Sequence, residues 1–364
     1  MTYGFGIVGC GMISKFHCQA IAEVSGARFI GCVSSRESSA QKLAEMFGGT
    51  AFRTLDEMLA DPKIDVVSIC TPSGAHLEPA IAAAKAGKHV IVEKPLEITL
   101  QRCDRIIQVC RDHDVRLTTI FPSRFQAANL TLKQAIDAGK FGRLTLGDVM
   151  VKWFRTQAYY DSGQWRGTWS LDGGGALMNQ AIHSVDLLTW LMGPVAELTA
   201  HVATLAHDRI EVEDVATASL KFVNGALGVI VATTAAYPGM LKKIEIHGSQ
   251  GSAVIEEEDF KSWMFSNMSA ADKEIASKLD TKSPTGGGAA DPAAIGHSAH
   301  AAQIRDFVMA LNNGTAPAIA GAEGRRSVEI VLAIYQAAET GLAVQLPLAK
   351  DPVLKARRSK LETS

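Results

Sequence analysis

The chain has 364 residues, of which 47% are hydrophobic and 20% are charged, as in an ordinary folded protein. Its formal net charge of −2 excludes an electrostatic basis for binding nucleic acid or an anionic membrane, and no apolar run is long enough to span a bilayer. Because this length exceeds one ordinary core, we expect two domains, residues 1–122 and 123–364.

The cysteines and the start of the chain bear on the cellular compartment. No cysteine pair has CxxC spacing, which predicts reduced thiols, no metal site and a cytoplasmic protein. The first predicted strand begins at Tyr3, which leaves no room for a signal peptide. All six cysteines lie in the first third of the chain: Cys10, Cys18, Cys32, Cys70, Cys103 and Cys110.

A phosphate-binding turn is predicted at residues 9–14, which read GCGMIS after an apolar strand at 3–8. The first glycine allows a tight turn, and the second lets the backbone approach a pyrophosphate. The predicted helix at 14–24 directs its N-terminal amides at the phosphates, and a second strand follows at 28–34. The residues expected at the dinucleotide are Gly9, Gly11, Met12 and Ile13.

The end of the second strand bears on the choice of cofactor. NAD-binding sites usually carry Asp or Glu there to bind the ribose hydroxyls. This chain reads Ser34-Ser35-Arg36, and hydroxyls with a guanidinium suit a 2′-phosphate. The neighbouring Glu37 weakens that preference without removing it. We therefore expect NADP(H) to be favoured over NAD(H).

Two further strand ends belong to the same edge of the predicted sheet. The strand at 65–70 ends in TPSGAH at 71–76, and the strand at 89–92 ends in Glu-Lys-Pro. Open α/β sheets bind ligands at the carboxyl ends of their strands. Proline pushes the preceding Lys94 towards extended geometry, so the ammonium is held at this edge. The residues expected near the cofactor are Thr71, Pro72, His76, Glu93 and Lys94.

Strands and helices alternate as far as residue 122, where a last strand at 115–120 ends. This alternation predicts an α/β fold with a doubly wound parallel sheet. Beyond it the pattern changes to a helix at 127–138, a strand at 142–153 and a helix at 176–191.

Successive strands with hairpin signals are predicted from 195 to 265, which indicates an antiparallel sheet. We expect one face of this sheet to be too apolar to remain in water and to form a homodimer or homotetramer. Residues 266–296 are rich in Ser, Ala, Gly, Asp and Lys, which is typical of a long surface loop, with an active-site lid as the alternative. Helices at 298–312 and 322–340 complete the fold.

Taken together, the ordered motifs resemble the glucose–fructose oxidoreductase/inositol dehydrogenase/MocA family over nearly the whole chain. The resemblance implies a Rossmann domain followed by an α/β domain with a large open antiparallel sheet. It also implies hydride transfer between a nicotinamide and a sugar-like alcohol or ketone. The segments that carry it are the GCGMIS turn, Thr71-Pro72 with His76, Glu93-Lys94-Pro95, residues 173–183, residues 211–214, Asn224-Gly225-Ala226 and residues 321–329.

The resemblance also assigns roles. The catalytic lysine of the family maps onto Lys94 and its catalytic histidine onto His183. Oxidation of a secondary alcohol needs a base, which a histidine supplies near neutral pH, while Lys94 hydrogen-bonds the same oxygen. Most members carry Asp four residues before that histidine, whereas this chain has Asn179, one predicted helical turn away, to hold a neighbouring hydroxyl. Further candidates to line the substrate pocket are Arg124, Trp165, Arg166 and His300.

Residues 159–183 most resemble the UDP-N-acetylglucosaminuronic acid 3-dehydrogenases, which share the asparagine, so C3 of a pyranose is one position for oxidation. The letters FPSRF at 121–125 depart from the Gln-Asn-Arg pattern expected there. Alternatives are a cyclitol dehydrogenase, a reductase of small aldehydes or ketones, and a regulator that binds dinucleotide without turnover. The presence of both Lys94 and His183 favours an enzyme over the regulator.

Overall fold

A computed structural model describes residues 1–279 and 296–354. The chain forms two compact units: unit 1 comprises Met1–Pro122 with Gly296–Val328, and unit 2 comprises Ser123–Ile295 with Glu329–Ser364. The sequence predicted residues 123–364 as one domain, whereas residues 296–328 group with the N-terminal unit. The reason is packing, because Ile304, Phe307 and Val308 share a buried apolar cluster with Cys18 and Ile21.

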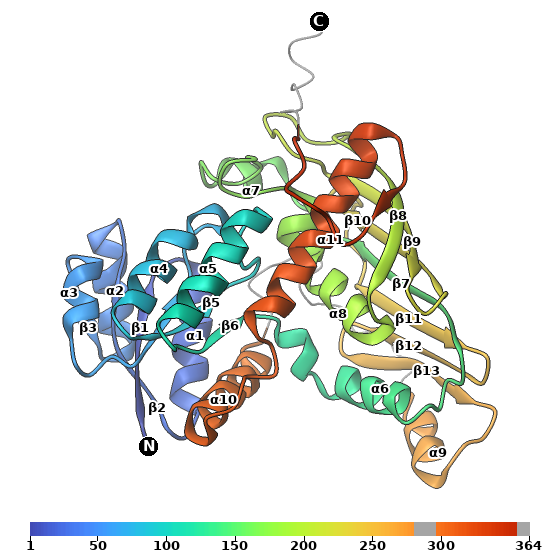
Figure 1. Cartoon of the computed structure of the whole chain (residues 1–364), viewed down its shortest axis with the longest axis horizontal. Helices are drawn as coiled ribbons and strands as arrows, with labels where there is room; N and C mark the ends of the chain where they lie inside the picture. The colour runs from blue at the N-terminus through green and yellow to red at the C-terminus, as the bar shows by residue number, and fades with distance from the viewer. Residues whose placement is uncertain (280–295, 355–364) are drawn as a thin grey trace, which may run out of the picture. The chain divides into compact units, whose positions relative to one another are not determined.

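Unit 1 contains a six-stranded sheet in the order β3-β2-β1-β4-β5-β6, and its neighbouring strands pair in parallel. Phe5, Val66 and Ile91 are fully buried, because helices cover both faces of such a sheet (Figure 1). The predicted doubly wound parallel sheet is therefore confirmed. The strands are β1 (Tyr3–Val8), β2 (Ala27–Val33), β3 (Thr50–Ala51), β4 (Val66–Ile69), β5 (His89–Val92) and β6 (Leu117–Thr119).

The helices of unit 1 begin where the sequence places caps or strand-end turns. Thr54 and Thr99 each accept a hydrogen bond from a backbone amide in the first turn of the helix that follows. The helices are α1 (Met12–Glu23), α2 (Glu37–Phe47), α3 (Leu55–Ala60), η1 (Ser73–Ala75), α4 (Leu77–Lys85), α5 (Leu100–Asp112) and α10 (Ser298–Asn313). The division between the units falls at η2 (Pro122–Phe125) and within α11 (Gly321–Thr340).

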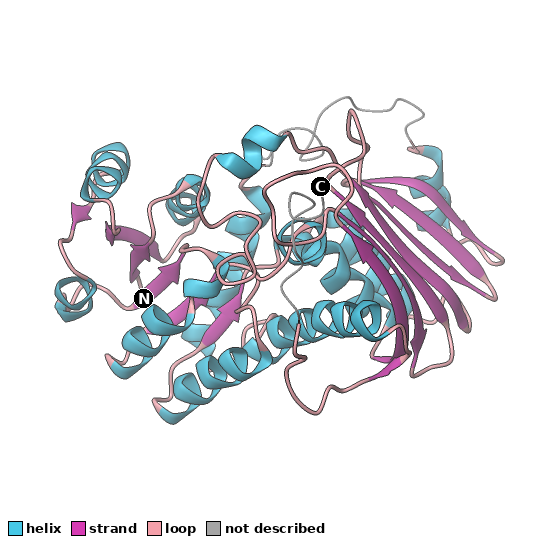
Figure 2. Cartoon of the chain, turned by 90° about the horizontal axis from the view of Figure 1, so that it is seen from above, coloured by secondary structure: helices cyan, strands magenta, loops and turns pink. Residues whose placement is uncertain are grey.

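Unit 2 contains an eight-stranded sheet in the order β13-β12-β11-β7-β10-β9-β8-β14. Figure 2 shows this large sheet in magenta. All of its pairings are antiparallel except that of β7 with β10, so the predicted large antiparallel sheet is confirmed with one parallel pair. The strands are β7 (Leu144–Lys152), β8 (Val195–Ala203), β9 (Val215–Phe222), β10 (Leu227–Thr233), β11 (Lys243–Gly248), β12 (Gly251–Glu256), β13 (Asp259–Phe265) and β14 (Val344–Gln345).

The helices of unit 2 are α6 (Ala127–Asp137), α7 (Gln157–Asp161), η3 (Ala176–Ala181), α8 (Ile182–Met192) and α9 (Ala270–Ser277). Helix α9 lies in the stretch 266–296 that was expected to be loop, and Ser269 with Asp272 forms a capping box at its start. Residues 280–295 lie outside the described residues, and the alternative of a lid rests on them. The predicted single helix at 176–191 is divided, because η3 is a π-helix and α8 is an α-helix.

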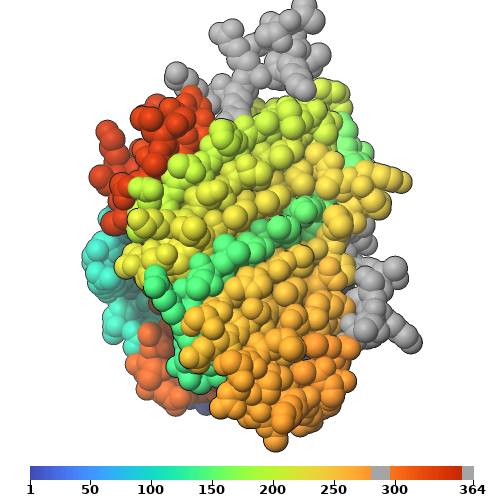
Figure 3. Space-filling model, turned by 90° about the vertical axis from the view of Figure 1, so that its right-hand side faces the viewer, coloured from blue at the N-terminus to red at the C-terminus, as the bar shows by residue number. Residues whose placement is uncertain are grey.

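One face of the eight-stranded sheet is open (Figure 3). Burial alternates along β9 and β10, so every second side chain lies on this face. The face was expected to be too apolar for water, but it is mixed. Val229 and Val231 are half-buried, whereas Asp148 lies opposite Glu245 on paired strands. Burial and the neighbouring Glu245 raise the pKa of Asp148. Any partner on this face must therefore match charges as well as apolar area.

Two properties of the whole chain bear on its environment. The six cysteines are all free thiols, five of them buried and Cys10 partly exposed. In residues 1–279 and 296–354, no helix combines the length and the apolar composition that crossing a membrane requires.

Candidate active site

The turn after β1 has the geometry that a pyrophosphate requires. Gly9 has a φ of 91°, and a Cβ there would lie 2.7 Å from the carbonyl oxygen of Cys70, so only glycine fits. A Cβ at Gly11, the residue before α1, would meet no described atom within 4 Å, so the backbone is open to a ligand. Met12 is 48% exposed beside it, and the Ser14 hydroxyl donates a 2.6 Å hydrogen bond to the Gly11 carbonyl. These residues fit a dinucleotide.

The polar group after β2 lies at the surface of unit 1. The backbone amide of Arg36 donates to the Ser34 hydroxyl at 3.4 Å, and Arg36 directly precedes α2. Ser35, Arg36 and Glu37 are all exposed, and Glu37 is the first residue of the helix. Arg36, whose charge favours binding of a 2′-phosphate, and Glu37, whose charge opposes it, are therefore adjacent in the sequence.

His76 connects the loops that follow β4 and β5. Its Nδ1 lies 2.9 Å from the carbonyl oxygen of Pro95, and its Nε2 lies 3.0 Å from that of Thr71. Burial lowers the pKa of His76. The Thr71 hydroxyl donates to the carbonyl of Ala75 at 2.9 Å, which closes the turn around Pro72. His76, predicted at the cofactor, thus holds Pro95 and, through it, the neighbouring Lys94.

Glu93 was predicted at the cofactor but is buried within unit 1. Its Oε1 lies 2.7 Å from Nε2 of His17, and its Oε2 accepts a 3.1 Å hydrogen bond from the amide of Lys94. His300, expected in the substrate pocket, belongs to the same cluster, with its Nε2 3.8 Å from Oε1 of Glu93. Burial lowers the pKa of His300 to about 4. His17 was not among the predicted site residues; its signal in the sequence was a histidine on the buried face of an apolar helix.

A π-helix carries Asn179 directly before the α-helix that carries His183. Glu213 fixes its start, because its two carboxylate oxygens accept from the amides of Gly175 at 3.0 Å and Leu177 at 2.8 Å. The Tyr335 hydroxyl donates to the same carboxylate at 3.0 Å, and burial raises the pKa of Glu213 to about 7. π-Helical turns are rare in proteins, and those that occur often lie at functional sites.

Asn179 is held from both ends of its amide. Its Nδ2 donates a hydrogen bond to Oδ1 of Asp172, and its Oδ1 accepts one of 2.9 Å from Nε2 of Gln180. Asp172 is only 2% exposed, and its Oδ2 accepts a 2.8 Å bond from the amide of Gly167. A buried carboxylate thus lies directly behind Asn179. Asp172 was not among the predicted site residues, because it is seven residues away from Asn179 along the chain.

We expect Asn179→Asp to destabilise the protein by about 1–3 kcal/mol at pH 8. Two carboxyl groups would then share one hydrogen bond, and since both cannot ionise, the pKa of the pair is raised. A raised carboxyl pKa costs stability as pH increases, so the loss should shrink towards pH 4. Thermal unfolding at the two pH values measures it. The exchanged variant Asp172→Asn with Asn179→Asp is the control and should recover most of the loss, whereas equal melting temperatures at pH 8 would contradict the argument.

Aromatic rings and arginines surround this segment in unit 2. The Arg166 guanidinium lies 4.3 Å from the ring centre of Tyr159 and 4.7 Å from that of Trp165, and it donates to the Tyr159 hydroxyl at 2.7 Å. Gln180 donates to the same hydroxyl at 2.9 Å and accepts from Arg155 at 2.9 Å. The structure therefore brings Trp165 and Arg166 together with Asn179 through Tyr159 and Gln180.

Arg124, a predicted substrate contact, pairs with a buried carboxylate of unit 2. Its Nε and Nη2 donate to the two oxygens of Asp186, each at 2.7 Å. Arg124 is 5% exposed and Asp186 is fully buried, and the guanidinium lies 5.5 Å from the ring centre of Trp190. Arg124 and Asp186 therefore form a buried bidentate ion pair, and the contact of Arg124 with substrate stays a prediction.

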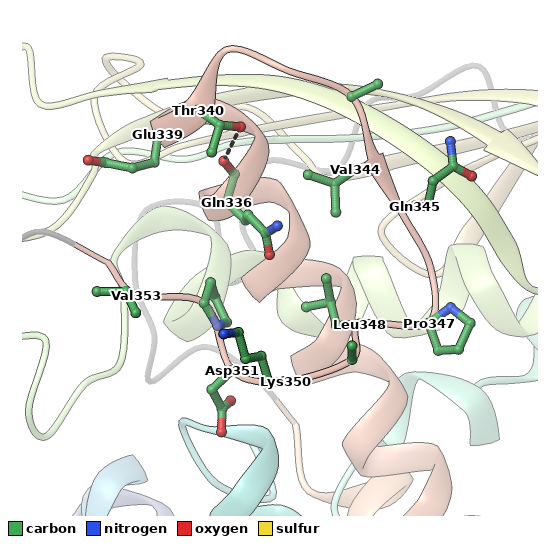
Figure 4. A pocket seen from close by; sticks show the side chains of 13 residues that line it. Gln336, Glu339, Thr340, Val344, Gln345, Pro347, Leu348, Lys350, Asp351 and Val353 are labelled. Carbon is green, nitrogen blue, oxygen red and sulfur yellow. Dashed lines mark hydrogen bonds between the residues drawn. The ribbon is translucent and has the colours of Figure 1, made fainter.

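A cavity of about 490 Å³ lies between α11 and the chain after β14 (Figure 4). None of the predicted site residues lines it. Its lining is Gln336, Glu339, Thr340, Ala343, Val344, Gln345, Pro347, Leu348, Ala349, Lys350, Asp351, Pro352 and Val353.

Several known proteins are similar to this chain. The myo-inositol 2-dehydrogenase of Thermotoga maritima is 32% identical over 259 residues, which are 68% of this chain and 73% of that protein. The WlbA dehydrogenase from Bordetella pertussis in complex with NADH and UDP-GlcNAcA has a TM-score of 0.85 at 35% identity, covering 96% of this chain and 100% of that one. Levoglucosan dehydrogenase in complex with NADH and levoglucosan has a TM-score of 0.83 at 25% identity, covering 95% and 100%.

Two family models match the chain itself. One is described as an oxidoreductase family with an NAD-binding Rossmann fold and matches residues 3–121. The other is the GFO/IDH/MocA C-terminal domain and matches residues 129–254. Together they span more than half of the chain and confirm the resemblance drawn from its motifs. The chain is therefore an NAD-binding oxidoreductase that belongs to the GFO/IDH/MocA family.

Proposed function

We propose that this enzyme transfers hydride between a nicotinamide and a secondary alcohol of a nucleotide-linked sugar acid, with C3 of the pyranose as the oxidised position. The observation that carries the proposal is the Arg166 guanidinium, stacked on Tyr159 and Trp165 and connected by hydrogen bonds to Asn179. A cation on aromatic rings suits an anionic substrate with a planar base. The WlbA dehydrogenase, 35% identical, was crystallised with UDP-GlcNAcA, which supports this class.

In the proposed mechanism, His183 takes the hydroxyl proton as general base. Lys94 hydrogen-bonds the same oxygen and stabilises the negative charge that develops on it. Asn179 holds an adjacent hydroxyl, with its amide oriented by Asp172 and Gln180. The turn that contains Gly9 and Gly11 would hold the pyrophosphate of the dinucleotide, which would supply the hydride acceptor when bound.

A panel of three compounds tests the proposal. Nicotinamide absorbance is followed with UDP-GlcNAcA, myo-inositol and levoglucosan, at matched concentrations and with each cofactor. We expect kcat/KM for UDP-GlcNAcA to exceed kcat/KM for either of the other two compounds by at least about tenfold. A tenfold ratio corresponds to about 1.4 kcal/mol, which one good contact can supply. Preferential turnover of myo-inositol would favour the cyclitol dehydrogenase instead. Cofactor binding without turnover of any of the three would favour the dinucleotide-sensing regulator.

We further propose that NADP(H) binds more tightly than NAD(H), because Ser34, Ser35 and Arg36 stand where a carboxylate is usual. Arg36→Ala should weaken NADP(H) by about 1.5–3 kcal/mol, the value of a charge-assisted hydrogen bond, with little effect on NAD(H). Glu37→Gln is the matched control and should strengthen NADP(H). Fluorescence titration of both cofactors measures this. Equal affinities in the unmodified enzyme would contradict it, and the NADH in the related structures makes this a stringent test.

We also propose that the open sheet face joins two or four copies of the chain. Val231 is half-buried on β10, an interior strand of the sheet. Val231→Lys should produce monomers, because it would bury an unpaired charge in the interface. Met46→Lys is the control, because Met46 is 58% exposed on α2 in unit 1. Light scattering at micromolar concentration distinguishes the states. A monomeric unmodified protein would refute the proposal.

The six free thiols support a reducing compartment, and the cytoplasm stays our prediction.

A further inference from the structure

A buried pair of charged side chains lies next to Lys94 in unit 1. His17 on α1 is completely buried, and its Nε2 lies 2.7 Å from Oε1 of Glu93. Oε2 of Glu93 accepts a 3.1 Å hydrogen bond from the backbone amide of Lys94. The two oxygens of one carboxylate therefore connect helix α1 to the peptide that carries the Lys94 side chain.

Both members of the pair are charged at neutral pH. Ser68 Oγ lies 2.8 Å from Nδ1 of His17, so both ring nitrogens have a partner. Burial lowers the pKa of His17, but Cys70 and the ionised Glu93 raise it to about 10. Burial raises the pKa of Glu93, but the hydrogen bond and charge of His17 lower it to about 2. The contribution of the pair to folding stability is therefore complete between about pH 4.5 and 6.5. This contribution is lost as pH falls through about 2 or rises through about 10.

We propose that His17 is a positioning residue for Lys94, acting through Glu93. By engaging one carboxylate oxygen, His17 aims the other at the Lys94 amide and so fixes the backbone from which the ammonium extends. The inference rests on the proposed function, in which Lys94 takes part in the chemistry. A displacement of about 1 Å at a reacting group can cost about 10²-fold in rate.

The charges that face Glu93 indicate what the loss of His17 would do. The cationic or titratable groups that act on this carboxylate include His17 from α1, His300 from α10, His76 from the loop after β4, and the adjacent Lys94. His300 is neutral near pH 7, because burial lowers its pKa to about 4, and its 3.8 Å separation is too long for a hydrogen bond. Without His17, the buried Glu93 carboxylate would attract the neighbouring Lys94 ammonium more strongly and draw it away from the substrate oxygen.

The experiment is a double-mutant cycle assayed near pH 7 with the sugar that the panel identifies. We expect His17→Gln to lower kcat by about 10²-fold while KM and cofactor affinity change little. Glu93→Gln should behave similarly. The double variant should lose no more than the worse single variant, because the two residues act as a unit. His297→Gln is the matched control, because His297 is a histidine of unit 1 that pairs with Glu23 at the surface at 2.7 Å, and it should keep nearly full kcat.

The outcomes separate this inference from the proposed function. A wild-type kcat in Lys94→Ala contradicts the proposed function itself. A large loss in Lys94→Ala with a wild-type kcat in His17→Gln overturns only the role of His17, as do additive losses in the cycle. Histidine NMR adds a readout that needs no substrate. One imidazole should stay protonated to about pH 10 in the unmodified protein and be absent in His17→Gln. If every histidine deprotonates below neutral pH, the imidazolium is refuted.

Discussion

Lys94→Ala and His183→Ala should each lower kcat by about 10²–10⁴-fold, the usual cost of removing a positioned acid or base. The physical reason differs between the two. Without His183 the hydroxyl proton has no acceptor, so the loss should diminish as pH rises and hydroxide becomes available. Without Lys94 the developing negative charge on the oxygen loses its cation, so the loss should persist at all pH values.

Steady-state kinetics across pH, with cofactor titration on the same samples, measures both effects. Cofactor affinity should change little in either variant, because neither residue lies in the turn at Gly9 and Gly11 that would hold the pyrophosphate. Asn179→Ala is the internal comparison and should mainly raise KM, because a neutral amide cannot carry the proton. Near-wild-type turnover in His183→Ala would show that another group is the base.

Arg124→Met should reduce the free energy of unfolding by about 3–5 kcal/mol, because it leaves the fully buried Asp186 carboxylate without its cation. Methionine keeps most of the apolar stem, so the loss reports the charge rather than a cavity. If Arg124 instead lined the substrate pocket, the main effect would be on KM. Denaturant unfolding together with KM for the sugar distinguishes the two roles.

The double variant Arg124→Met with Asp186→Leu is the control for this prediction. Replacing both members of a buried ion pair with apolar residues is often neutral or stabilising, so most of the lost stability should return. Asp186→Asn alone should resemble Arg124→Met in size. An unchanged stability in Arg124→Met, with a raised KM, would restore the sequence-based interpretation of Arg124 as a substrate contact.

The alternation of strands and helices in unit 1 and the dinucleotide turn could be predicted from the sequence because their signals are local. Consecutive apolar residues in β4 and β5 indicate strands buried on both faces, and the spacing of Gly9 and Gly11 reflects what the backbone must do within one turn. The family motif around Lys94 is equally local. Such features depend on neighbours in the sequence, so no tertiary information is needed to find them.

Only the tertiary structure decided which side chains meet. Glu93 pairs with His17, 76 residues away, and Arg124 pairs with Asp186, 62 residues away. Helix α10 returns to pack with α1, and β7 pairs in parallel with β10. Carboxylates, histidines and arginines are plausible at an active site and in a buried ion pair alike, and the residue type does not distinguish the two. The partner does, because burial makes an unpaired charge costly, and the partner is chosen by the fold.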